Sequence, residues 1–79
     1  MKQDQQAKSL AELPPGDQAT ILNIDGDDAV TARILEMGVS PGCPVKVIGK
    51  APLGDPIEIE IRNYRLSIRI EEARRIQIS

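Results

Sequence analysis

The side chains capable of chemistry in this sequence are hydroxyls, one thiol and carboxylates, because the chain contains no histidine. A hydroxyl or thiol nucleophile needs an adjacent base, and no imidazole is present to activate one. The candidate nucleophiles are Ser9, Thr20, Thr31, Ser40, Cys43, Ser67 and Ser79. Zinc sites with imidazole ligands are excluded because the chain has no histidine, and paired-cysteine metal knuckles are excluded because it has one cysteine. We therefore predict no catalytic residues and no enzymatic activity.

Cys43 is the one cysteine of the chain, so it has no partner for an internal disulfide. Its neighbours Gly42 and Pro44 favour a turn, and a lone thiol fits a reducing compartment. We interpret Cys43 as an inert turn residue, with a reactive thiol as the alternative.

An acidic cluster, Asp25-Gly26-Asp27-Asp28, precedes a segment with helical periodicity. Carboxylates at that position accept hydrogen bonds from free backbone N–H groups and favour the positive end of the helix dipole. The alternative is a sensor site in which Asp25, Asp27 and Asp28 bind a ferrous or manganous ion, although the spacing is not that of a calcium loop. We predict the capping role, no metal site and no cofactor, with Fe2+ as the alternative ligand.

Composition limits the class of protein further. The chain has 79 residues, a net charge of −2, one tyrosine and no other aromatic residue, which fits one small domain. Arginines near the C-terminus are interleaved with acids and there is no platform for stacking bases, so we predict no nucleic-acid binding. No apolar run approaches the roughly 20 residues of a membrane span, and residues 1–6 lack the apolar run of a signal peptide. We expect a cytoplasmic protein without membrane insertion.

Periodicity and turn residues divide the chain into short elements. Residues 1–9 are predicted to be a flexible tail, and a helical turn over residues 9–12 is stopped by Pro14 and Pro15. The one proper helix spans residues 29–37, with Gly38 as its stop. The other expected elements are strands at 17–24, 45–48 and 76–78 and a helical turn at 71–74.

Strict alternation of apolar and charged residues marks the clearest signal, over residues 57–62 and again over 65–70. We predict a hairpin closed by Asn63-Tyr64. This register pairs Ile61 with Leu66, Ile59 with Ile68 and Ile57 with Ile70, and places Glu58 opposite Arg69. Five strands and one short α-helix in about 70 residues indicate a mainly β fold, a small β-barrel.

The turns, the helix and a proline-flanked loop together resemble the FeoA family of ferrous iron transport proteins. The resemblance runs from about Leu10 to Ser79, and its most specific part is the run Ala51-Pro52-Leu53-Gly54-Asp55-Pro56 before an alternating strand. Further matching segments are 31–42, 45–47, Tyr64-Arg65-Leu66 and Glu72-Ala73.

The resemblance implies an SH3-like β-barrel over residues 10–79 and a small cytoplasmic accessory protein. Its implied partner is the membrane permease of bacterial ferrous iron uptake, whose cytoplasmic part is a GTPase. The family is also similar in fold to the third domain of iron-dependent repressors and shares a label of transition-metal binding with it. The implied alternative function is therefore a metal-binding sensor domain.

The loop Pro52-Leu53-Gly54-Asp55-Pro56 is the predicted partner-binding site, helped by Arg33. The two prolines fix their own φ angles and Gly54 permits a sharp reversal, so the loop is stiff. A stiff loop with Leu53 at its tip loses little entropy on docking and serves as an anchor. The alternative is a plain connector in which Asp55 bonds nearby backbone N–H groups. For Arg33 the alternative is a helix-surface cation near Glu36.

Two further alternatives concern other partners. A module for proline-rich peptides needs an aromatic-lined groove, which Tyr64 alone does not provide. The terminal strand 76–78 either pairs within the barrel or exposes an edge to a second copy. We expect a monomer.

Overall fold

The structure is a computed structural model that describes residues 8–79. Its elements in chain order are β1 (Lys8–Ser9), the 3₁₀ helix η1 (Leu10–Glu12), β2 (Gln18–Ile24), α1 (Ala29–Glu36), β3 (Pro44–Lys50), β4 (Ile57–Ile61), β5 (Tyr64–Ile68), α2 (Ile70–Ala73) and β6 (Ile76–Ile78). The mainly β class is confirmed, with six strands where about five were expected. The predicted helical turn near residue 71 is the short helix α2.

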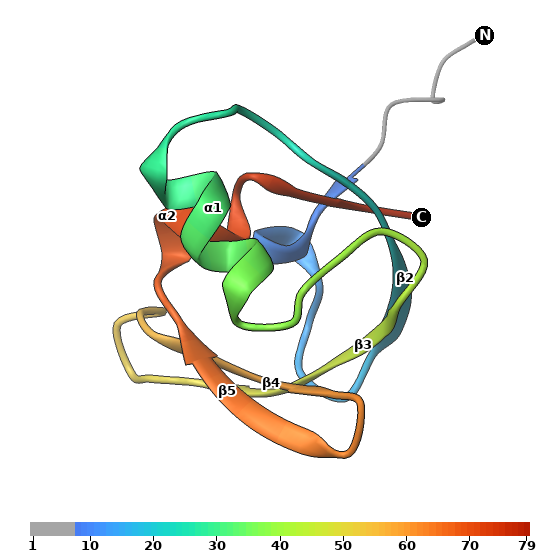
Figure 1. Cartoon of the computed structure of the whole chain (residues 1–79). Helices are drawn as coiled ribbons and strands as arrows, with labels where there is room; N and C mark the ends of the chain where they lie inside the picture. The colour runs from blue at the N-terminus through green and yellow to red at the C-terminus, as the bar shows by residue number, and fades with distance from the viewer. Residues whose placement is uncertain (1–7) are drawn as a thin grey trace, which may run out of the picture.

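The six strands form one antiparallel sheet in the order β1-β6-β2-β3-β4-β5. The first residues of β2 pair with β3, whereas its last residues pair with β6. One strand therefore connects the two halves of the sheet, and the sheet curves around the core in Figure 1, with α1 and α2 beside each other.

The apolar residues Ile21, Leu22 and Ile24 of β2 do not alternate strictly with polar ones, and irregular strand pairing explains why. The register between β2 and β6 shifts between Ile21 and Asn23, which leaves Leu22 as an extra residue with 50% of its surface exposed. Such a bulge lets two residues of one strand oppose one residue of its neighbour and bends the strand. A second shift lies in β3 between Val47 and Gly49.

The predicted hairpin of β4 and β5 exists, but its register was wrong by two residues. Ile61 pairs with Tyr64, Ile59 with Leu66 and Ile57 with Ile68, so the closing turn is Arg62-Asn63 rather than Asn63-Tyr64. Both turn residues have positive φ, 53° and 75°, as a type I′ hairpin turn requires. A shift of two residues keeps every side chain on its face, so alternation did not distinguish the two registers.

The predicted tail of residues 1–9 overlaps the sheet at its end. Lys8 and Ser9 form β1 and pair with Ile78 and Gln77 of β6, so the terminal strand is enclosed between β1 and β2. The rest of that tail, residues 1–7, lies outside the described residues.

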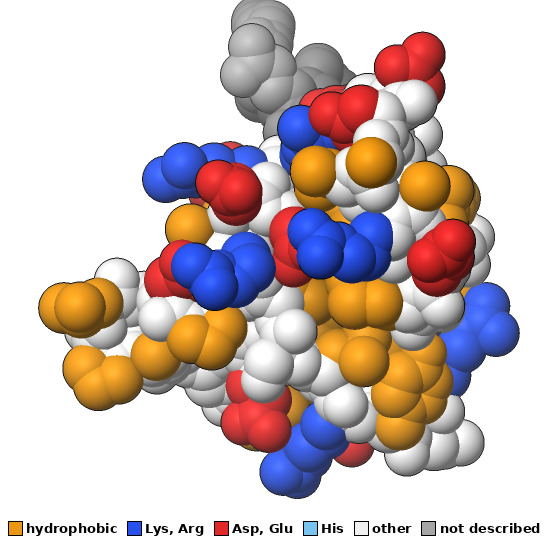
Figure 2. Space-filling model, turned by 60° about the vertical axis from the view of Figure 1, so that its left-hand side comes forward, with side chains coloured by type: hydrophobic (Ala, Val, Ile, Leu, Met, Phe, Trp, Pro, Cys, Tyr) orange, Lys and Arg blue, Asp and Glu red, His pale blue; other side chains and the backbone are white. Residues whose placement is uncertain are grey.

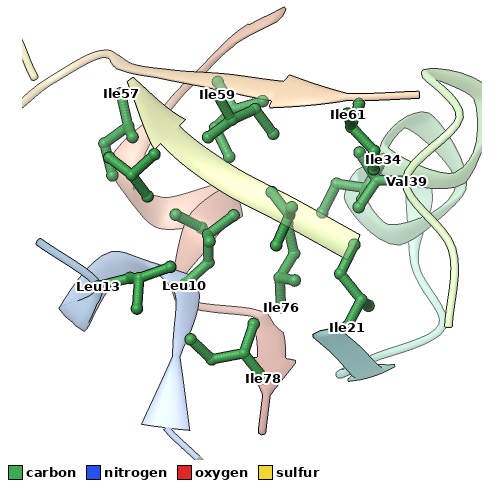
Figure 3. Close-up of a cluster of buried hydrophobic side chains, with 14 of the residues drawn as sticks. Leu10, Leu13, Ile21, Ile34, Val39, Ile57, Ile59, Ile61, Ile76 and Ile78 are labelled. Atoms are coloured by element: carbon green, nitrogen blue, oxygen red, sulfur yellow. The ribbon is translucent and has the colours of Figure 1, made fainter. Parts of the chain in front are cut away.

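Isoleucine side chains of the strands build most of the core inside the curved sheet, to which η1 contributes Leu10 and α1 contributes Ile34 (Figure 3). The largest fully buried side chains are Leu10, Ile21, Ile34, Val39, Val45, Val47, Ile57, Ile59, Ile61, Ile68, Ile76 and Ile78. Every charged residue of β4 points away from this layer, as alternation predicted. Within residues 8–79, no helix has both the length and the apolar character needed to cross a membrane.

Candidate partner-binding surface

The loop between β3 and β4 is a compact turn that projects from the end of the sheet (Figure 1). Gly54 N–H donates to the Ala51 carbonyl oxygen at 2.7 Å, and Ala51 N–H donates to the Pro56 carbonyl oxygen at 3.0 Å. Gly54 has a φ of +85°, which glycine adopts without strain. The two hydrogen bonds close the base of the loop and hold its tip apart from the body.

Asp55 fixes this loop to the segment that follows β5. Its Oδ1 atom accepts a hydrogen bond from Ile70 N–H at 3.0 Å and lies 3.6 Å from the Arg69 Nε atom. A side-chain hydrogen bond from Asp55 was expected under the connector interpretation, but its donor is fifteen residues away in sequence. The loop therefore keeps its position relative to α2.

Leu53 lies at the tip of the loop with 96% of its surface exposed. The other large exposed hydrophobic residues, Leu22, Leu35 and Tyr64, are 40% to 50% exposed. Because the Leu53 side chain is exposed to solvent, it contributes nothing to the core. Burial of this side chain by a partner would be favourable by about 2 kcal/mol.

Arg33 makes its ion pair with Glu72 of α2 rather than with Glu36 of its own helix. The Arg33 Nε atom lies 3.6 Å from Glu72 Oε2. Glu72 Oε1 in turn accepts a hydrogen bond from Arg69 N–H at 2.8 Å, which caps the start of α2. Arg33 therefore joins α1 to α2, a role that periodicity within α1 did not predict.

A hollow of about 510 Å³ brings part of the predicted site together. We call it the arginine groove, and its lining residues are Arg33, Met37, Asp55, Ser67, Arg69, Glu71 and Glu72. Arg33 and Asp55, both predicted site residues, lie in it, whereas Pro52, Leu53, Gly54 and Pro56 do not. On the face drawn in Figure 2, Lys or Arg atoms lie beside Asp or Glu atoms at the centre.

Sequence reasoning missed Arg69 and Ser67 as groove residues. The available signal was the position of Arg69, directly after an alternating strand and before a helical turn. The C-terminal arginines were interpreted only as charges interleaved with acids, and this obscured the signal.

The acidic cluster before α1 caps the helix. Asp28 Oδ1 accepts from Thr31 N–H at 3.2 Å and from Arg75 Nη1 at 2.6 Å, and Asp25 Oδ1 accepts from Gln77 Nε2 at 2.7 Å. The hydrogen bond from Arg75 lowers the pKa of Asp28, and the hydrogen bond from Thr31 N–H adds to the effect. Residues 8–79 contain no group of three or more Cys, Asp or Glu side chains placed to hold a metal ion.

Cys43 is buried at the end of the turn before β3. Its Sγ atom lies 3.3 Å from Ser40 Oγ and accepts a hydrogen bond from Arg62 Nη2 at 3.0 Å. These two contacts, that of Ser40 first, lower the pKa of the thiol. Arg62 thereby links the β4–β5 turn to the turn before β3.

Comparison with known proteins assigns the family. The model of the FeoA domain matches residues 8–79, which is the whole of the described chain. This chain belongs to the FeoA family.

A curated FeoA relative and two solved structures extend this assignment. A "Fe(2+) transport protein A/Fe(2+) transporter FeoB fusion protein" of Porphyromonas gingivalis is 42% identical over 69 residues, which are 87% of this chain and 8% of that protein. The chain thus spans less than a tenth of the length of this relative. A FeoA-like protein from Clostridium acetobutylicum superimposes with a TM-score of 0.88 at 33% identity, over 92% of this chain and 85% of that one.

Stenotrophomonas maltophilia FeoA, solved with zinc and described as a procaryotic SH3 domain protein, superimposes with a TM-score of 0.80 at 30% identity. The superposition covers 92% of this chain and 91% of that one. The SH3-like fold expected for FeoA is therefore confirmed.

Proposed function

We propose that this FeoA-family chain is a non-enzymatic accessory protein of ferrous iron transport. In this proposal it acts in the cytoplasm as a monomer, docks on the cytoplasmic GTPase region of the ferrous iron permease and modulates transport. Leu53, presented by the Pro52–Pro56 turn, is the anchor, and Arg33 assists from α1.

The exposure of Leu53 carries the proposal. A leucine that is 96% exposed on a turn closed by two backbone hydrogen bonds is already in a conformation from which it can bind. Docking then orders few additional bonds, so most of the free energy of burying the leucine remains as affinity. Aliphatic or aromatic anchors in a partner's pocket contribute a large share of binding energy at interfaces.

The fusion protein of Porphyromonas gingivalis supports the identity of the partner. In that protein a FeoA-like segment and a FeoB transporter share one polypeptide. Covalent linkage keeps two modules at high effective concentration, which favours contact between them. We extend that association to this chain as a contact between separate molecules.

The metal-sensor alternative gains no support from the acidic cluster. Asp25 and Asp28 already accept hydrogen bonds from Gln77 and Arg75. The Arg75 guanidinium places a positive charge 2.6 Å from Asp28 Oδ1, and that charge disfavours a divalent cation at the same carboxylate.

The test is a titration of the full-length permease in lipid nanodiscs with the wild-type chain and with Leu53→Ala, in each nucleotide state. We expect the substitution to weaken binding about 30-fold, as the loss of about 2 kcal/mol of apolar burial implies. Leu22→Ala is the matched control, because Leu22 is an exposed leucine on β2, outside the loop. Equal affinity of wild type and Leu53→Ala would remove the anchor, and no binding in any nucleotide state would refute the proposal.

A further inference from the structure

We propose that the outer edge of β5, together with the arginine groove, binds an extended acidic segment of a partner protein as an additional strand. This surface does not include Leu53, although it shares Arg33 and Asp55 with the predicted partner-binding residues, and the inference does not depend on the proposed function.

The outer edge of β5 is an open strand edge. β5 is the last strand in the sheet order, with β4 as its one neighbour. In a hairpin closed by a two-residue turn, the pair that flanks the turn is hydrogen-bonded and every second pair repeats it. Tyr64, Leu66 and Ile68 therefore bond to β4, whereas the N–H and C=O groups of Arg65 and Ser67 point outward. Outside the strand ladders, no hydrogen bond within residues 8–79 uses these outward backbone groups.

The two ends of this edge differ. At its start, the Tyr64 hydroxyl donates a hydrogen bond to the carbonyl oxygen of Met37, the residue after α1, so this end of the strand is held against the turn that follows α1. Further along, Ser67 lines the arginine groove together with Met37 and Arg69. An added strand would thus run from Arg65 past Ser67 into a hollow of about 510 Å³, which has room for its side chains.

The charged groups of the groove are arranged in two layers. In the Arg33–Glu72 pair, 66% of the arginine side chain is exposed but only 9% of the glutamate side chain. In the Arg69–Asp55 pair, the corresponding exposures are 72% and 31%. Although acids outnumber arginines among the lining residues, two of the three acids, Asp55 and Glu72, are held beneath guanidinium groups. A partner approaching this edge therefore meets the exposed guanidinium groups of Arg33 and Arg69, with Glu71 as the one exposed acid of the groove lining.

Hydrogen-bonding capacity also remains in these arginines. Both ion pairs involve the Nε atom, and no hydrogen bond from the Nη atoms of Arg33 or Arg69 to another residue in 8–79 is formed. Guanidinium N–H groups form short, charge-assisted hydrogen bonds with carboxylates, often two at a time. Acidic side chains of an added strand are their natural acceptors.

The same charges disfavour a second copy of this chain as the occupant. Pairing β5 with another β5 would bring Arg65 and Arg69 of both molecules to one edge, and like charges across a strand pair are destabilising. Backbone hydrogen bonds supply affinity in strand addition and side chains supply specificity. We therefore assign the edge to an extended segment with alternating apolar and acidic residues.

The test is an NMR titration of the full chain with a peptide of about seven residues that alternates valine and glutamate, a typical strand length. A valine–lysine peptide of the same length is the matched control. We expect saturable shifts of the Arg65 and Ser67 amides with the acidic peptide, slower hydrogen exchange of both amides and weaker binding at higher salt.

Two pairs of variants separate the backbone contribution from the charge contribution. Ser67→Pro removes an outward N–H without removing a hydrogen bond to β4 and should weaken binding about tenfold, whereas Ser67→Ala should not. Arg69→Gln should weaken binding several-fold, whereas Arg74→Gln, an exposed arginine outside the groove, should not. Leu53→Ala should leave peptide binding unchanged.

Each opposite result contradicts the inference. Equal shifts with both peptides, or no shift of the Arg65 and Ser67 amides at millimolar peptide, would overturn it. Concentration-dependent shifts of these amides without peptide would assign the edge to a second copy instead. If Ser67→Pro does not fold, the comparison of the two peptides and of the two arginine variants still decides.

Discussion

The Asp28 carboxylate accepts a hydrogen bond from the Arg75 guanidinium at 2.6 Å, across 47 residues of sequence. This contact joins the N-cap of α1 to the residue that precedes β6. The same carboxylate oxygen accepts the Thr31 N–H of the first helical turn. One side chain therefore positions α1 against the sheet and also starts the helix.

Acidification should destabilise the fold through Asp28. Because its pKa is lower in the folded chain than in the unfolded chain, its contribution is present above the unfolded pKa and is lost as the pH falls through the folded pKa. Asp28→Asn keeps a capping oxygen but removes the charge, so its melting temperature should depend less on pH in this acidic range than that of the wild type. Calorimetry across acidic pH tests this, with Asp27→Asn as control. Identical pH profiles for wild type and Asp28→Asn would contradict the linkage.

A side chain at Gly38 should destabilise the fold for two separable reasons. Its φ is +95°, and an added Cβ atom would collide with the Tyr64 hydroxyl. Gly16 has a similar φ of +92° but open space around it, so Gly16→Ala isolates the cost of the backbone conformation. We expect about 1 kcal/mol of destabilisation for Gly16→Ala and about 2 to 3 kcal/mol for Gly38→Ala, measured by urea unfolding. Tyr64→Phe in the Gly38→Ala background should recover part of the difference in the free energy of unfolding between the two variants. Equal destabilisation by Gly16→Ala and Gly38→Ala would show that the contact with the Tyr64 hydroxyl is relieved at no cost.

Substitution of the buried Ile59 and of the exposed Leu53 should have different effects on the free energy of unfolding. Ile59 is fully buried, and Ile59→Ala should lower the free energy of unfolding by about 3 kcal/mol through lost burial and a cavity. Leu53→Ala should change it by less than about 0.5 kcal/mol, because the side chain is 96% exposed. Chemical denaturation measures both values. A large loss of stability in Leu53→Ala would mean that the loop supports the fold rather than a partner.

The thiol of Cys43 should titrate below the range of an ordinary cysteine, because Ser40 and Arg62 stabilise its charged form. Ser40→Ala and Arg62→Gln should each raise the pKa of the thiol, the former by more. The ultraviolet absorbance of the thiolate reports this titration directly. Arg65→Gln is the control, since Arg65 has no contact with Cys43 among the hydrogen bonds of residues 8–79. An unchanged pKa in both variants would remove these contacts as the cause.

Local patterns were sufficient for most elements of the fold. The end of α1 just before Gly38, the alternating strands β4 and β5 and the short terminal strand β6 follow from nearest neighbours along the chain. The helix and five of the six strands were therefore found close to their observed bounds, whereas β1 had been assigned to the tail. The face of each isoleucine was also determined locally, because alternation has a fixed period of two.

The hairpin register required information that alternation does not contain. Registers that differ by two residues bury the same faces, so the decision falls to the turn. Arg62 and Asn63 adopt positive φ, and Arg62 gains a contact with Cys43 nineteen residues earlier in the chain. A contact of that kind exists only after the two turns have come together in the folded chain.

For the candidate surfaces too, some features could be derived from the sequence and others only from the tertiary structure. The stiffness of the Pro52–Pro56 loop and the absence of a histidine base could be derived from the sequence, because the first depends on residue types at adjacent positions and the second on composition. Only the tertiary structure placed Arg33 over Glu72, Arg69 beside Asp55 and the edge of β5 next to both arginines. Those contacts join segments far apart in the chain, and the packing of α1 and α2 against the sheet decides which charges meet.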